Sequence, residues 1–268
     1  MTTNNILSKE NKALLAELVR TDFKLRYQGS VLGYAWSLLR PLLMFGIYYV
    51  VFAVVFRFGD EIPNFPIYLL LGIVLWNFFQ ETTSQSLGAI VVRADLVRKI
   101  KIPRWMIVVS AGIGASINLA LNFLVIILFA AINGLDFLSS SVYLPLFILE
   151  IYLFALGLSL ILSALFVKYR DIGYIWDVVL QAGFYATPIL YPLSLVTSET
   201  AQRIMFLNPM AQSIQGARNS FVTPESVTIA EPWGSNWAVL LPLGIVVLTL
   251  IIGVLYFSRQ SKTFAENL

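Results

Sequence analysis

The sequence contains neither cysteine nor histidine. Thiol nucleophiles, disulfide scaffolds, imidazole bases and the usual zinc sites are therefore excluded, and no hydrolytic triad is expected. No glycine is followed by lysine, so the phosphate-binding loop GxxxxGKS/T is also absent. If ATP powers this protein, another subunit binds it. No DxD-like metal-binding motif is present to support a membrane-embedded glycosyltransferase.

Charge is scarce as well. Charged residues make up 12% of the 268-residue chain, whereas 58% of its residues are hydrophobic. A chain of this length and composition is too apolar for a soluble domain. We therefore predict an all-α polytopic membrane protein, whose core is buried in lipid and in contacts between helices.

Six apolar segments are long enough, or nearly so, to cross a hydrocarbon layer of roughly 30 Å as helices. We predict that these spans occupy residues 34–58, 67–92, 105–132, 142–167, 172–187 and 237–257. The fifth is short, because Pro188 and Pro192 break it. We expect residues 188–236 to form re-entrant outer gate helices, and a plain external loop with one surface helix is the alternative.

The basic residues are distributed unevenly between the loops. With these spans, all of the 18 Lys and Arg residues except Arg57, Arg203 and Arg218 lie on one side of the membrane. Loops rich in Lys and Arg stay in the cytoplasm. Both termini are therefore expected to be cytoplasmic.

Residues 9–28 have the pattern of an amphipathic helix. Leu14 and Leu18 share one side with Leu25, and charged residues lie opposite. We expect this helix to lie in the membrane interface. Gly29 and Gly33 follow it, and they predict a hinge between the interface helix and the first span.

The loop Arg93–Arg104, with the sequence RADLVRKIKIPR, is short and strongly basic. Residues 94–102 are compatible with a small amphipathic helix that docks into a groove of a cytoplasmic partner. The alternative is that its basic residues only satisfy the positive-inside rule and touch lipid phosphates.

Aromatic and polar residues mark particular faces of the predicted spans. Tyr48, Phe52 and Phe56 recur every four residues and predict a stripe on one helix face. Such a stripe suits the apolar faces of sugar rings, although packing and lipid contact are alternatives. Glu81 lies in a polar band of the second span and is expected to face helices, a partner or water.

Six stretches in order resemble one family, the permease subunits of ABC-2 type exporters of polysaccharides such as O-antigen, capsule and teichoic acid. The stretches are Leu18–Leu42, Asp95–Arg104, Phe166–Ile172, Phe184–Pro192, Leu207–Arg218 and Phe264–Leu268. The resemblance implies a single ABC-2 type transmembrane domain over residues 1–268, which acts as a homodimer in the bacterial cytoplasmic membrane. It also implies two copies of a separate ABC ATPase that binds ATP and Mg, with no cofactor on this chain and no nucleic acid.

The resemblance and the charge pattern together assign candidate roles to individual residues. Coupling to the ATPase is expected of Asp95, Leu96, Val97, Arg98, Lys99, Lys101, Pro103, Arg104, Lys168, Arg170 and Asp171. The interface helix and the entrance for an anionic lipid head group are expected to use Arg20, Asp22, Lys24, Arg26 and Tyr27. The channel aromatics are expected to be Tyr48, Phe52, Phe56, Phe184 and Tyr185, and the outer gate residues Pro188, Pro192, Asn208, Pro209 and Arg218.

The sequence therefore predicts a channel-forming permease that exports a lipid-linked polysaccharide and leaves ATP hydrolysis to a partner. An ABC-2 exporter of a small lipid or drug is one alternative, although such exporters often carry a large external domain where this chain has only the turn Gly59–Pro66. An ion-coupled secondary transporter, with Glu81 as its coupling carboxylate, is another.

Overall fold

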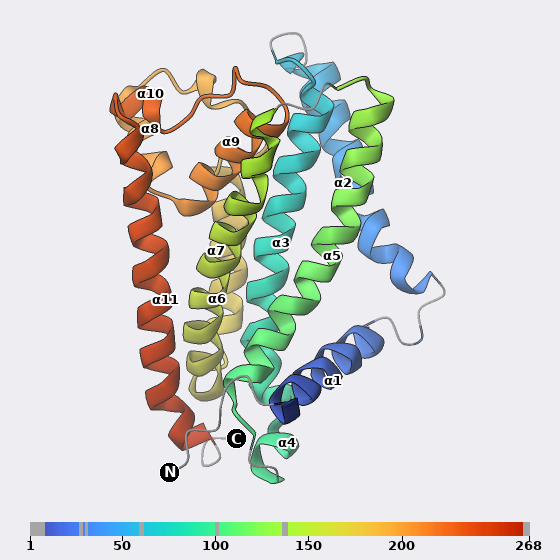
Figure 1. The fold of residues 1–268 in the computed structure, drawn as a ribbon, viewed down its shortest axis with the longest axis vertical. Coiled ribbons are helices and arrows are strands. Elements are labelled where there is room, and N and C mark those ends of the chain that lie inside the picture. Colours follow the sequence, from blue (N-terminus) through green and yellow to red (C-terminus); the bar gives the residue numbers. More distant parts are fainter. Residues whose placement is uncertain are drawn as a thin grey trace.

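The computed structural model describes residues 9–26, 29, 32–58, 62–99, 102–135 and 139–264. Throughout these residues the regular structure is helical, and no β-strand occurs in them (Figure 1). The longer helices are α1 (Lys9–Arg26), α2 (Trp36–Tyr49), α3 (Phe65–Val92), α5 (Trp105–Ile132), α6 (Leu144–Lys168), α7 (Ile172–Ala186) and α11 (Leu240–Gln260). The shorter helices are α4 (Ala94–Lys99), α8 (Glu199–Phe206), α9 (Pro209–Phe221) and α10 (Ala230–Trp233). Single turns are η1 (Gly33–Ala35), η4 (Ser139–Tyr143), η5 (Leu193–Leu195), η6 (Asn236–Val239) and η7 (Ser261–Thr263), and η2 (Val50–Val55) is a π-helix that continues α2.

Helix α3 is the central element of the bundle. It packs against α5 and α6 along its length, and also contacts α2, α7 and α9. Its N-terminal half, from Phe65 to Trp76, is apolar on almost every side and is almost entirely buried. A helix that is apolar all round must be covered on all sides, so this composition places α3 in the centre.

Helix α11 lies on the outside of α6. The two backbones approach closely at Gly157 and Gly253, where a Cβ atom added to Gly157 would lie 2.8 Å from the nitrogen of Leu250. Only glycine permits this approach, as is common between helices in membranes. Gly157 and Gly253 therefore let α11, whose other side chains are largely exposed, pack closely against α6.

Within the described residues, four helical segments are long and apolar enough to cross a membrane: Trp36–Val55, Trp105–Ile132, Ser139–Lys168 and Asn236–Thr263. The second predicted span is the 28-residue α3, which carries the polar band around Glu81. The fifth is α7, which has 15 residues, fewer than the roughly 20 that a span needs. All six predicted segments are thus helical, and the count of six spans stays a prediction.

The two ends of the bundle are built differently (Figure 1). We call the lower one the α4 end: α1 lies obliquely against α5, and α4 packs through Val97 into a cluster with Ile107, Val167, Phe257 and Phe264. We call the upper one the α9 end, where α8, α9 and α10 form a cap between α7 and α11. The predicted gate region 188–236 therefore contains short helices joined by loops, and their re-entrant depth in a membrane stays a prediction.

Candidate functional site

Helix α4 is short and is anchored by one side chain. Val97 is 6% exposed, whereas Asp95 and Arg98 are exposed and Leu96 is half-buried. After α4, Pro103 and Arg104 lead into α5, and the Arg104 guanidinium lies 6.0 Å from the centre of the Phe264 ring. Lys99 ends α4, and Lys101 lies outside the described residues. The helix thus presents a mixed polar surface while one apolar side chain holds it to the bundle.

Asp22 connects α1 to the base of α4. Its carboxylate forms an ion pair with Arg93, which lies between α3 and α4, and accepts a hydrogen bond of 3.1 Å from the hydroxyl of Ser110 in α5. Both charged side chains are largely shielded, with 16% and 19% of their surfaces exposed. Burial lowers the pKa of the Arg93 guanidinium from its ordinary value, which makes a carboxylate partner important there. Three elements therefore meet at Asp22.

The second predicted coupling contact lies in the turn between α6 and α7. Lys168, Arg170 and Asp171 are all exposed there. The Lys168 ammonium lies 5.1 Å from the Tyr169 ring, and the Arg170 guanidinium lies 5.2 Å from the Phe166 ring. This turn follows Val167, which packs in the same cluster as Val97 of α4. The two predicted coupling segments are therefore at the same end of the bundle.

A groove of about 760 Å³ runs between α1 and α5. Its lining combines apolar and basic side chains: Leu15, Ala16, Val19, Ile113 and Ile117 with Lys12, Arg20 and Lys24. The predicted head-group residues Arg20 and Lys24 thus share one groove, Arg26 is the last residue of α1, and Tyr27 lies outside the described residues. An apolar wall beside three cations suits an amphiphile with an anionic head.

The predicted hinge glycines have left-handed backbones. Gly29 has φ +79° and Gly33 has φ +49°. A Cβ atom added at either position would meet none of the described residues within 4 Å. Side chains other than glycine are therefore disfavoured here by backbone strain and not by crowding.

The predicted channel aromatics form two groups. The Tyr48 ring of α2 lies 5.8 Å from Phe184 of α7, and Phe184 lies 5.4 Å from Tyr185 and 5.9 Å from Trp76. In the second group, Phe52 lies 5.6 Å from Phe56 and 5.9 Å from Phe58. The first group joins α2 to α7, whereas the second sits at the end of the π-helix η2.

Arg218 of α9 holds the cap to the centre of the bundle. Its side chain is fully buried, and its guanidinium donates to three backbone carbonyls: Tyr68 at 3.0 Å, Pro188 at 2.6 Å and Ile189 at 2.6 Å. The guanidinium carbon also lies 3.6 Å from the centre of the Tyr68 ring. One side chain therefore fixes the segment after α7 against α3.

The remaining predicted gate residues shape the same region. Asn208 caps the start of α9, because its side-chain oxygen accepts from the backbone of Met210. Its amide also donates to the hydroxyl of Thr187 at 3.1 Å. Pro209 is the first residue of α9, where a missing backbone N–H does no harm. Pro192 is buried next to η5. Asn208 and Arg218 thus both connect α9 to the end of α7.

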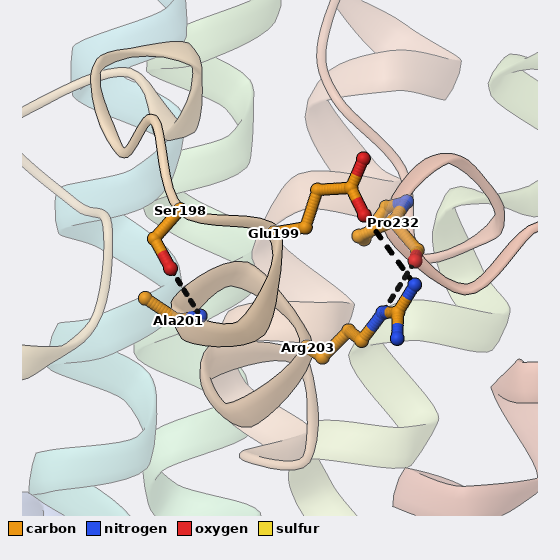
Figure 2. A network of polar contacts seen from close by, with 5 residues as sticks. All are labelled: Ser198, Glu199, Ala201, Arg203 and Pro232. Atoms are coloured by element: carbon orange, nitrogen blue, oxygen red, sulfur yellow. Dashed lines mark hydrogen bonds and ion pairs between the residues drawn. The ribbon is translucent and has the colours of Figure 1, made fainter.

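Figure 2 shows how α8 is joined to α10. Arg203 donates to the carbonyl of Pro232 at 2.7 Å and pairs with Glu199 at 3.4 Å. Ser198 caps the start of α8 by accepting from the backbone of Ala201. In contrast to Arg218, Arg203 is exposed, so this connection lies on the surface of the cap.

The sequence model of the "ABC-2 type transporter" family matches residues 13–222. The chain belongs to this family. It is therefore a multi-pass membrane component of a transporter, and the family resemblance read from the six motifs is confirmed. The matched region includes the Asp22 connection, the groove between α1 and α5, and Arg218.

Relatives of this ABC-2 transporter chain match it over almost its full length. It is 32% identical to the O-antigen export system permease protein RfbA of Myxococcus xanthus over 258 residues, 96% of each chain. It is 30% identical to a protein of the same name from Klebsiella pneumoniae over 260 residues, 95% of each chain. The polysialic acid transport protein KpsM of Escherichia coli is 22% identical over 252 residues, which cover 93% of this chain and 94% of KpsM.

Two structurally important residues were not recognised from the sequence. Tyr68 accepts from Arg218 through its backbone, but it lies inside an apolar run that gives no polar signal. Glu150 is 6% exposed within α6. Its signal was present, because a carboxylate within a predicted span is unusual. Glu81 carries the same signal in the second predicted span.

Proposed function

We propose that this chain is the channel-forming permease subunit of an ATP-driven exporter of lipid-linked, cell-surface polysaccharide. The observation that carries the proposal is similarity over 93–96% of the chain to proteins named for O-antigen export and polysialic acid transport. These relatives have different polymers in their names and share the task of moving a glycan. The proposal therefore extends to the class of substrate and not to one polymer.

The proposed assembly is a homodimer of this chain with two copies of a separate ABC ATPase, which binds ATP and Mg. Six spans cross the bacterial cytoplasmic membrane, and both termini are cytoplasmic. The distribution of charge supports this orientation, because Arg98, Arg104, Lys168 and Arg170 all belong to the α4 end. The ATPase accordingly docks at the α4 end.

The proposed mechanism starts when nucleotide closes the ATPase and pushes on α4. Because Arg93 pairs with Asp22, the push reaches α1 as well as α3. The hinge at Gly29 and Gly33 passes the movement to α2, whose Tyr48 packs on Phe184 of α7. The polymer advances as α2 and α7 shift, and it leaves past the cap at the α9 end.

The groove between α1 and α5 supports a lipid-linked substrate in particular. Lys12, Arg20 and Lys24 attract a phosphate-bearing head group at the membrane surface. Leu15 and Ile117 provide an apolar wall beside them. A polymer without a lipid anchor would make no favourable contact with this apolar wall.

The division of labour is tested by ATP hydrolysis. We expect the purified chain to hydrolyse no ATP alone and to support hydrolysis only with its cognate ATPase. Leu96→Asp should preserve folding and assembly but reduce glycan export at least tenfold, because it places a charge on the docking surface of α4. Leu96→Met is the matched control and should export normally. Hydrolysis by the lone chain, or full export by Leu96→Asp, would contradict the proposal.

A further inference from the structure

A second cavity, of about 380 Å³, lies between α2, α3 and α5. Its lining consists of Trp36, Ser37, Arg40 and Pro41 from α2, Asn77, Gln80, Glu81, Ser84 and Gln85 from α3, and Asn118 from α5. Its volume falls within the range of roughly 300–1,000 Å³ that is typical of ligand pockets. Unlike most such pockets, it is lined almost wholly by side chains that are able to form hydrogen bonds.

The wall of the cavity is an ordered network. Glu81 accepts hydrogen bonds from the amides of Gln85 at 2.9 Å and Asn118 at 2.5 Å. One turn further along α5, the amide of Asn122 donates to the backbone carbonyl of Ser37 at 3.3 Å. These bonds hold the start of α2 beside α3 and α5. The polar groups are therefore positioned before any ligand arrives.

One buried polar atom of this network has no protein partner. Asn118 is 4% exposed, and within the described residues its side-chain oxygen accepts no hydrogen bond. An unsatisfied buried acceptor costs about 1–3 kcal/mol, so such atoms are uncommon unless something else binds them. The atom belongs to a residue that lines the cavity. A hydroxyl-bearing ligand could satisfy it.

The lining argues against most other ligands. The Glu81 carboxylate opposes a phosphate, and the Arg40 guanidinium opposes a metal cation. No group of three or more carboxylate side chains that could hold a metal occurs in the described part of the chain. A lipid tail would leave the amides of Asn77 and Gln80 without partners, which is unfavourable.

A sugar fits the same lining well. Each sugar hydroxyl both donates and accepts, and the amides of Asn77 and Gln80 likewise offer a donor and an acceptor. Trp36 is 45% exposed and adds an aromatic ring for the apolar face of a sugar ring. The combination of amides, one carboxylate, one guanidinium and one indole suits a neutral, hydroxyl-rich ligand.

The position of the cavity fits an early point on a transport path. Glu81 lies 11 residues before Val92, the end of α3, which is about 16 Å along the helix. Asn118 lines this cavity, and the preceding residue, Ile117, lines the basic groove between α1 and α5. The two cavities therefore adjoin the same turn of α5, one suited to a charged lipid head and the other to sugars.

We propose that the cavity between α2, α3 and α5 is a carbohydrate-binding subsite, which holds sugar units of the glycan next to its lipid anchor. This inference rests on the proposed function, and it names the residues that contact the sugars. Because the site is preformed and rich in amides, it recognises hydroxyl patterns and thereby favours one glycan over another.

The test is photo-cross-linking in the native host, whose surface glycan is labelled with a radioactive sugar. We replace Ser84, an exposed residue of the cavity lining, by p-benzoylphenylalanine, and we replace Leu248 on the outer face of α11 as the matched control. After irradiation, we expect labelled glycan on the chain carrying the Ser84 substitution and none on the control. Normal export without label at position 84 would overturn the subsite and leave the exporter function intact. If cells that lack the chain display their glycan normally, the proposed function is wrong, and the subsite with it.

A second measurement uses substitutions in the assembled transporter. Asn77→Leu with Gln80→Leu should reduce export about tenfold, as expected for the loss of one or two hydrogen bonds, while the variant assembles normally with its ATPase. Trp36→Ala should also reduce export, whereas Trp36→Phe keeps a ring and should restore it. Full export by the double Leu variant, or equal export by the two Trp36 variants, would overturn the subsite.

Discussion

The α4 end and the α9 end of this ABC-2 transporter chain use their polar side chains in opposite ways. At the α9 end, the fully buried Arg218 bonds to three carbonyls, and the hydroxyls of Ser140 and Ser141 both donate to the carbonyl of Ser220. At the α4 end, Asp95 and Arg98 of α4 are exposed, and the partly buried Asp22 of α1 pairs with Arg93 and accepts from Ser110. Among the described residues, the α9 end therefore places a fully buried cation on three carbonyls, whereas most charged side chains of the α4 end are exposed.

This difference shows how α4 could move under the proposed push from the ATPase while the rest of the bundle keeps its packing. A helix of six residues such as α4 is unstable alone, so it is held in place by Val97 and by any partner that docks on it. Segments with few buried contacts move at low free energy, whereas buried networks do not. The α4 end is therefore suited to movement, and the α9 end to holding the proposed exit side in place.

The largest expected effect comes from removing the buried guanidinium. Arg218→Met removes the guanidinium donor from the buried carbonyls of Pro188 and Ile189 and the contact with Tyr68 of α3, which should destabilise the chain by about 3 kcal/mol or more. The measurement is the melting temperature of the purified protein in detergent. Arg203→Met is the matched control in the same cap, and it should change stability by less than about 0.5 kcal/mol because Arg203 is exposed. Equal shifts for the two variants would show that the α9 end is not pinned by Arg218.

The positions of the long helices could largely be predicted from the sequence. The predicted span 105–132 coincides with α5, and the predictions for α3, α6, α7 and α11 lie within three residues of the observed ends. Continuous apolar runs bounded by prolines or charges carry this information locally. The first predicted span, 34–58, likewise lies within three residues of the helical segment Trp36–Val55, but nothing in its sequence indicates the π-helix η2.

The polar contacts between helices could not be predicted in the same way. Asn208 was expected as an outer gate residue from the family resemblance, and its role as the cap of α9 comes from the structure. The Asp22 bond to Arg93 and the Arg218 bond to Tyr68 join residues 71 and 150 positions apart. Such pairs depend on how helices pack, and they leave no periodic pattern in either segment. The sequence therefore indicated the ends of the bundle and not the bonds that distinguish them.

The next effect in size concerns the Asp22 connection at the α4 end. Asp22→Arg should reduce export about tenfold with normal assembly, because the push on α4 no longer reaches α1. The exchange Asp22→Arg with Arg93→Asp should recover most of the export, since it keeps an ion pair of the opposite polarity at the same place. Export per ATP hydrolysed is the quantity to measure. A double variant no better than the single one would mean that the pair has no part in coupling.

The smallest expected effect separates backbone strain from crowding at the hinge. Gly29→Leu with Gly33→Leu should lower export a few-fold, because each leucine is held in a left-handed backbone at a cost of about 1–2 kcal/mol. Gly29→Asn with Gly33→Asn should export nearly normally, since asparagine tolerates that backbone. Gly234 has φ +67° at the α9 end and also has open space around it, so Gly234→Leu introduces the same strain at the pinned end and should leave export unchanged. Normal export by the double Leu variant would reduce the corner between α1 and α2 to a topological bend, and the contrast between the two ends would then rest on α4 and Asp22 alone.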